Sequence, residues 1–212
     1  MFPDYSRPER LADAAVHGLG VVAALAGTGA LLAAVIPSGG ARAAVGAAVY
    51  AAGLLATVGA SAAYNLTAAP GPKEIIRRCD HAAVFLMIAG TYTPFALAAI
   101  GGAAGAVLLA VMWTLALVGA AGKLLRPRRF ERASLLLYLA LGWIGLAALG
   151  VLIEAAPGSA VALLLAGGAL YTAGVVFHLW RSLPYHNALW HAFVLAGAGC
   201  HYVAVYAVLA GA

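Results

Sequence analysis

Three pairs of polar residues lie four positions apart within otherwise apolar stretches of the sequence. They are Asp13 with His17, Ser61 with Asn65, and Asn187 with His191. Because residues four apart project from the same face of an α-helix, each pair presents two polar groups in one direction. Carboxylates and imidazoles serve as general acids, general bases and metal ligands, and amides and hydroxyls form hydrogen bonds. The spacing therefore predicts a polar site assembled from several helices.

The composition shows what surrounds these residues. Of the 212 residues, 65% are hydrophobic and 9% are charged, whereas soluble domains have about 45–50% apolar and about 25% charged residues. This excludes a soluble globular protein and a disordered chain, and two cysteines exclude a disulfide scaffold. Since one span needs about 20 apolar residues, we predict an all-α polytopic membrane protein, a seven-transmembrane-helix bundle.

Prolines and glycine-containing gaps divide the apolar residues into spans. One run, residues 80–122, is about twice the length of a span, and we divide it at Gly101-Gly102. Pro94 lies inside an apolar stretch and predicts a kink. The predicted helices of this single domain, 1–212, lie near residues 14–36, 43–66, 80–100, 103–122, 133–153, 159–180 and 188–211.

The basic residues predict the orientation of these helices. Eleven of the twelve fall on one side of the predicted membrane, and only Arg42 falls on the other. By the positive-inside rule, the N-terminus is cytoplasmic and the C-terminus is outside. The eleven are Arg7, Arg10, Lys73, Arg77, Arg78, Lys123, Arg126, Arg128, Arg129, Arg132 and Arg181. They also suit contact with anionic lipid headgroups, so we expect membrane lipids as partners and no nucleic acid, and the sequence sets no oligomeric state.

This topology brings polar residues of four helices to the cytoplasmic side. Ionisable groups at membrane depth are costly and are therefore candidates for function. We interpret one set as a shared site: Ser61, Asn65, Asp80, Asn187 and His191. We interpret a second set as interfacial, hydrated or capping groups: Asp13, His81, His178 and His186. His201 is predicted about 15 Å from His191, at 1.5 Å per residue.

Longer stretches of the sequence resemble a known family. They are Glu9–Asp13 with His17-Gly18, Ser61–Tyr64, Asp80-His81, Ala89–Phe95 and Ala188–Leu195. Together they are similar to the hemolysin III branch of the progestin and adipoQ receptor family. The resemblance implies seven helices with the N-terminus inside, as the charges predict, and a multi-pass location in the bacterial inner (plasma) membrane.

The resemblance also implies a zinc ion near the cytoplasmic face. In the family's pattern three histidines hold this zinc ion. One lies four residues after a serine in the second span, and the other two lie four residues apart in the seventh span. An aspartate in the third span lies beside them. Such a site suits hydrolysis of lipid amides by a metal-activated water. Ser61, Asp80 and His191 match the pattern. Asn65 and Asn187 stand where the family has histidines.

The two asparagines leave three arrangements open. The favoured one is a hydrogen-bonded network without a metal, because an amide oxygen is a weak ligand for zinc. The second is a weak or different divalent cation, held by Asp80, His191, Asn65 and Asn187. The third is zinc held through other histidines, such as His17 and His81.

Three functions follow from these arrangements. The favoured one is a non-enzymatic, receptor-like or membrane-homeostasis role. The second is a metal-dependent hydrolase of lipid amides or esters, with Asp80 as general base or ligand, His191 as ligand or proton carrier and Ser61 as polar stabiliser. The third is an ion or proton pathway or a cytolytic pore, in which His201 would be a station.

Overall fold

The computed structural model describes residues 5–37, 39–126 and 131–211. Within these ranges it has seven helices long and apolar enough to cross a membrane, and it has no strand. The prediction of an all-α, seven-helix membrane bundle is therefore confirmed. The orientation of the termini relative to the membrane stays a prediction.

Several spans begin or end beyond their predicted limits. Pro70 and Pro72 lie in the first turn of the third span, where a missing N–H costs nothing, so this helix starts ten residues before the predicted residue 80. The helices are α1 (Arg7–Val35), α2 (Gly40–Leu66), α3 (Pro70–Pro94), η1 (Phe95–Ile100), α4 (Gly102–Leu125), α5 (Glu131–Trp143), η2 (Ile144–Ala148), α6 (Leu149–Ala155), α7 (Gly158–Leu179) and α8 (His186–Ala210).

The helix does not end at Pro94. It continues as the π-helix η1, which closes with a hydrogen bond of 3.0 Å from the Gly101 N–H to the Ala96 carbonyl. Gly101 and Gly102 have φ angles of 62° and 53°, which a glycine adopts without strain. The turn between the third and fourth spans therefore falls at the predicted Gly101-Gly102 pair.

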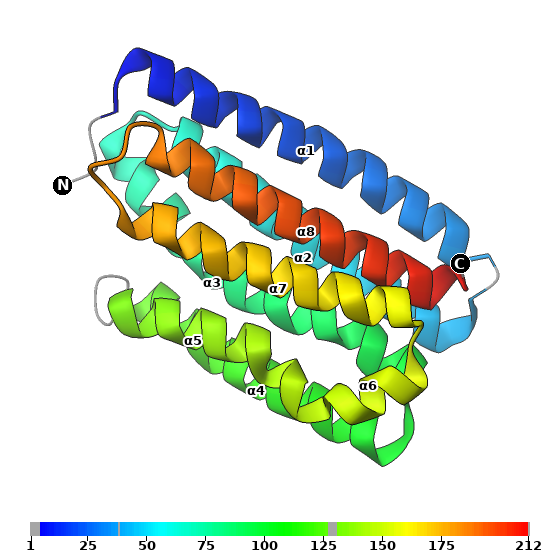
Figure 1. Cartoon of the computed structure of the whole chain (residues 1–212). Coiled ribbons are helices and arrows are strands. Elements are labelled where there is room, and N and C mark those ends of the chain that lie inside the picture. The colour runs from blue at the N-terminus through cyan, green and yellow to red at the C-terminus, as the bar shows by residue number, and fades with distance from the viewer. Residues whose placement is uncertain (1–4, 38, 127–130, 212) are drawn as a thin grey trace.

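The spans form two layers in which sequence neighbours pack against each other. Figure 1 shows α1, α8 and α7 side by side, with α2 and α3 behind them and α4 and α5 along one flank. Helix α5 makes few contacts with α3, α4 and α7. Helix α8 lies between α1 and α7, and it also contacts α2 and α3.

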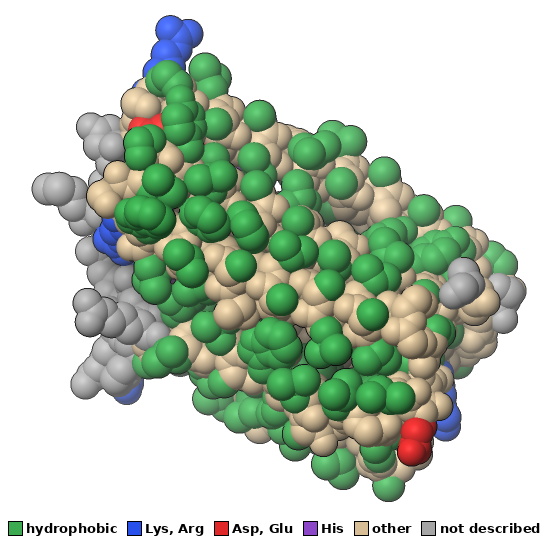
Figure 2. Space-filling view, in the orientation of Figure 1, with side chains coloured by type: hydrophobic (Ala, Val, Ile, Leu, Met, Phe, Trp, Pro, Cys, Tyr) green, Lys and Arg blue, Asp and Glu red, His purple; other side chains and the backbone are tan. Residues whose placement is uncertain are grey.

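The charged residues gather at the two ends of the bundle. Apolar side chains cover the face between them in Figure 2. We call the end at which α1, α3, α5 and α8 begin the basic end. Arg128 and Arg129 lie outside the described residues, and the side chain of Arg132 is not described. The basic end carries Arg7, Arg10, Lys73, Arg77, Arg78, Lys123, Arg126 and Arg181, whereas Arg42 and Glu154 lie at the opposite end.

The half of the bundle opposite the basic end is tightly packed. Leu31, Tyr50, Phe95 and Val205 are at most 1% exposed and belong to one apolar cluster that joins α1, α2, η1 and α8. Burial of apolar surface at about 25 cal/mol per Å² holds soluble cores together. In a lipid bilayer this burial provides little driving force, because the lipid tails are as apolar as the side chains. Van der Waals contacts in the close fit stabilise the helix packing instead. This fit fixes the four helices against one another.

A carboxylate at the basic end ties the start of α1 to the start of α8. Ser6 and Glu9 form a capping box, in which the Ser6 N–H donates to the Glu9 carboxylate at 2.9 Å. The second oxygen of Glu9 accepts a hydrogen bond of 3.0 Å from the N–H of Tyr185. Tyr185 precedes α8 with a φ angle of 60°, in the left-handed region. This bond links the start of α1 to the start of α8.

Replacing Gly105 by alanine should destabilise the bundle. A Cβ at this position would overlap the backbone carbonyl oxygen of Ala96 in η1, so the two helices would have to separate. Such overpacking costs about 1–3 kcal/mol. The thermal unfolding midpoint in detergent should fall. Gly122→Ala is the matched control on the same helix, because a Cβ there meets nothing within 4 Å; equal midpoints for the two variants would contradict the packing described for α4 and η1.

Candidate functional site

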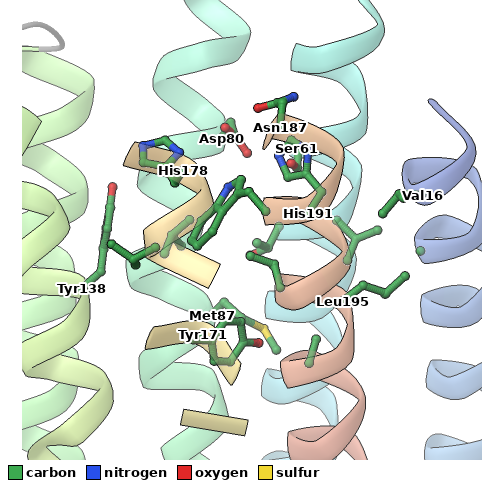
Figure 3. A pocket seen from close by; sticks show the side chains of 18 of the residues that line it. Val16, Ser61, Asp80, Met87, Tyr138, Tyr171, His178, Asn187, His191 and Leu195 are labelled. Atoms are coloured by element: carbon green, nitrogen blue, oxygen red, sulfur yellow. The ribbon is translucent and has the colours of Figure 1, made fainter. Parts of the chain in front are cut away.

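A cavity of about 1550 Å³ lies inside the bundle and reaches the basic end. It exceeds the roughly 300–1,000 Å³ of typical small-molecule pockets. Side chains of α1, α2, α3, α5, α7 and α8 line it. In Figure 3 Ser61, Asp80, Asn187 and His191 come from three helices and point toward one another, with Met87 and Tyr171 deeper. All the polar residues predicted from the sequence line the cavity: Asp13, His17, Ser61, Asn65, Asp80, His81, His178, His186, Asn187, His191 and His201.

The closest polar contact between helices joins α1 and α8. The Asp13 carboxylate lies 2.6 Å from Nδ1 of His191, and its other oxygen lies 3.6 Å from Nε2 of His17. The rings of His17 and His191 are tilted against each other, with centroids 4.3 Å apart. Asp13 and His17 are 8% and 6% exposed. One carboxylate thus faces two imidazoles in a largely buried setting.

Asp13, interpreted from the sequence as an interfacial, hydrated or capping group, is therefore buried between helices and does not cap α1. Asp13 lies in the second turn of α1, on the face that packs against α8, and Ser6 rather than Asp13 caps this helix. The i, i+4 spacing of Asp13 and His17 was the available signal, since it puts both residues on that face. His186 is also buried, at 8% exposure, with its ring 5.6 Å from the ring of Tyr5.

The predicted residues of α2 and α3 form a second polar group in the same cavity. Ser61 and Asp80 point toward one another in Figure 3, and the Asp80 carboxylate also interacts electrostatically with His17 and Arg77. Asp80 thereby connects the α2–α3 side of the cavity to the α1–α8 cluster. Asp80 and His17, which were not placed in one set from the sequence, thus line the same cavity.

The two asparagines are engaged with each other and with the backbone. The side-chain amide of Asn65 donates to the Ser61 carbonyl at 3.0 Å, and that of Asn187 donates to the Asn65 side-chain oxygen at 3.4 Å. His191, the remaining imidazole of the family's zinc pattern, is turned toward Asp13. These positions offer one imidazole and two amide oxygens, which are weak metal ligands, so they do not fit a zinc ion.

The other histidines lie around the cavity in separate settings. The backbone carbonyl of His81 accepts a bond of 2.8 Å from the Tyr138 hydroxyl of α5. The ring of His178 lies 5.1 Å from that of Trp190. Nε2 of His201 lies 3.2 Å from the Leu164 carbonyl, so this histidine is held by α7 deep in the bundle.

Positive charge surrounds the cavity at the basic end. Arg77 is 7% exposed and donates to Glu74 at 3.0 Å, and Lys123 is 4% exposed. Cationic residues that line the cavity are Arg7, Arg10, Lys73, Arg77, Lys123 and Arg181. Deeper lining residues such as Met87, Phe95, Leu152, Val161 and Leu164 are apolar. The cavity is therefore cationic and polar at one end and apolar along the rest.

This arrangement supports two kinds of chemistry. A carboxylate that holds an imidazole at hydrogen-bond distance fixes the orientation of the ring and can share a proton with it. Asp13, His17 and His191 also offer three ligand atoms that lie within 4.8 Å of one another, so the cluster could hold a metal ion.

Comparisons with known proteins relate the whole chain to one family. The family model described as Haemolysin-III related matches residues 6–202. The chain is similar to Hemolysin-3 of Bacillus cereus, with 38% identity over 197 residues that cover 93% of this chain and 90% of that protein. It is also similar to the Hemolysin-3 homolog of Bacillus subtilis (strain 168), with 34% identity over 197 residues that cover 93% and 92%. No solved structure matches the chain.

Removing the Asp13 carboxylate should destabilise the protein. In Asp13→Ala the buried His191 ring loses its partner, which costs about 1–3 kcal/mol. For a chain of this size that corresponds to a midpoint lowered by about 2–12 °C, measured by thermal unfolding in detergent. Glu154→Ala is the control, because it removes an exposed carboxylate at the opposite end. If the two variants unfold at the same temperature, the Asp13–His191 contact does not stabilise the bundle.

Proposed function

The chain belongs to the haemolysin-III related family, and we propose that it is a receptor-like membrane protein that binds an amphipathic lipid in its internal cavity. The observation that carries this proposal is the shape and polarity of that cavity. It combines a volume of about 1550 Å³ with a polar, cationic end and an apolar remainder. A lipid with one headgroup and a hydrocarbon chain has the same distribution of polarity.

The headgroup would lie at the basic end of the bundle. Lys73, Arg77 and Lys123 line this part of the cavity beside Asp80 and Ser61. Cationic side chains attract carboxylate or phosphate groups, and the hydroxyl and amides can form hydrogen bonds to a neutral headgroup. A carboxylate or phosphate headgroup suits this end best.

The hydrocarbon chain would extend toward His201. His191 and His201 are ten residues apart on α8, which corresponds to about 15 Å of helix. Between them α8 contributes Val194, Leu195 and Ala198 to the cavity wall, and α7 contributes Leu164 and Leu165. Apolar walls of this kind favour an alkyl chain over water.

The ligand would enter from the membrane between α5 and α7. These helices touch sparsely, yet both line the cavity. A hydrogen bond of 3.0 Å from the Trp143 indole N–H to the Thr172 hydroxyl links them. With the basic end at the cytoplasm by the positive-inside rule, the lipid would come from the inner leaflet of a bacterial plasma membrane.

Filling the cavity should abolish lipid binding. Ala198→Phe adds a ring to the cavity wall on α8, whereas Ala192→Phe adds the same ring to an exposed position of that helix outside the cavity lining. Native mass spectrometry from detergent, with palmitic acid or a lysophospholipid as probe, should show one lipid per chain. We expect Ala198→Phe to weaken binding by roughly tenfold or more, equivalent to about 1.4 kcal/mol. Equal binding by both variants, or no saturable binding by the parent protein, would reject the proposal.

Hydrolysis of a lipid amide or ester is the second candidate. The observation that favours it is the Asp13–His191 contact of 2.6 Å in the same cavity as Ser61 and Asp80. In this reading Asp80 is the general base or a ligand, His191 carries a proton and Ser61 stabilises the polar group under attack. A divalent cation such as zinc would supply an activated water when bound.

Turnover separates the two candidates. Purified protein in liposomes that contain a short-chain ceramide or a lysophospholipid should release fatty acid only if the hydrolase reading holds. Asp80→Ala should then abolish the release, whereas Glu154→Ala should leave it unchanged. Lipid binding without fatty acid release would leave the receptor-like function standing and remove the hydrolase.

A further inference from the structure

We propose that Asp13, His17 and His191 form a divalent transition-metal site between α1 and α8, which shares only His191 with the positions that the family resemblance assigns to zinc. One oxygen of Asp13 and one ring nitrogen of each histidine lie within 4.8 Å of one another. Asp13 and His17 come from one face of α1, and His191 comes from the facing side of α8. The site goes beyond lipid binding and does not depend on it.

An unpartnered nitrogen points into this cluster. Nε2 of His17 is shielded from solvent and has no hydrogen-bond partner among the described residues. The nearest Asp13 oxygen, at 3.6 Å, is beyond hydrogen-bond distance. A buried polar atom left in this state costs about 1–3 kcal/mol. A bound cation would give the nitrogen a partner.

One of the distances between the ligand atoms already suits tetrahedral coordination. Metal–ligand distances of about 2.0–2.2 Å place two ligands of a tetrahedral ion about 3.3–3.6 Å apart. The distance from Asp13 to His17 is already 3.6 Å. The 2.6 Å between Asp13 and His191 is a hydrogen bond, and it would lengthen when a cation replaces the shared proton.

The donor set selects the class of cation. Two imidazole nitrogens and one carboxylate oxygen suit zinc and neighbouring transition metals, whereas calcium and magnesium take oxygen ligands. Three protein ligands leave a coordination position open, as in catalytic rather than structural zinc sites. The cluster lines the cavity, and Asp80 interacts with His17 from α3, so the open position would face the proposed lipid headgroup.

The two asparagines are compatible with this position of the metal. Asn65 and Asn187 are hydrogen-bonded to each other and to the backbone of α2, so they do not occupy the ligand atoms of the cluster. Their replacement of histidine therefore removes the site on the α2 side and leaves the α1–α8 cluster intact.

Metal content tests the proposal directly. The full chain, purified in detergent and stripped with a chelator, is reloaded with Zn²⁺ or Co²⁺, and bound metal is measured by elemental analysis. We expect one ion per chain, intense visible absorption from tetrahedral Co²⁺, and a higher unfolding midpoint with Zn²⁺. His17→Gln and Asp13→Asn should each weaken retention by at least roughly tenfold, because each removes one of three ligands.

Two controls make the result specific. His81→Gln removes another cavity-lining histidine that is outside the cluster. The double variant Asn65→Ala/Asn187→Ala removes the amides. Both should bind metal as the parent does. Absence of stoichiometric metal in the parent, or an equal loss in His81→Gln or in the double variant, would overturn the proposal. Lipid binding is measured on the same metal-stripped parent protein. This measurement tests the proposed function independently of the metal site.

Discussion

The contact of 2.6 Å between the Asp13 carboxylate and His191 joins the first spanning helix to the last. In a bundle with so few charges, a buried carboxylate persists only if another helix supplies its partner. Helix α8 supplies that partner, and it also packs against α2, α3 and α7. The position of α8 therefore determines both how the bundle closes and how the cavity is shaped, since its inner face carries Asn187, His191, Ala198 and His201.

Much of the fold was predictable because it depends on composition and spacing. Seven spans follow from the apolar runs, and the i, i+4 pairs led to the polar residues that line the cavity. The start of α3 was not predicted, because Pro70 was read as a break although the first turn of a helix tolerates proline. The partner of Asp13 was not predicted for another reason: its spacing to His17 puts both on one face of α1, but its contact with His191 depends on the packing of α1 against α8.

Because of Asn65 and Asn187, membership of the family does not by itself imply a zinc-dependent activity for this chain. The chain shares the haemolysin-III related family over residues 6–202, but Asn65 and Asn187 are hydrogen-bonded to each other where the resemblance implies metal-binding imidazoles. The described cavity retains Ser61, Asp80 and His191 in one place. A lipid-binding cavity needs only its shape and polarity, whereas a hydrolase also needs an activated water.

The hydrogen bonds at the basic end also bear on how the protein is made. Glu9 binds the N–H of Tyr185 and Asp13 binds His191, contacts that span 176 and 178 positions of the chain. Helix α1 leaves the ribosome first and α8 last, so neither contact exists until nearly the whole chain has been synthesised. During membrane insertion Asp13 and His17 therefore lack their α8 partner while the earlier helices assemble. The polar site is the last part of the molecule to be completed, and a chain cut before α8 would contain most of the spans but none of these contacts.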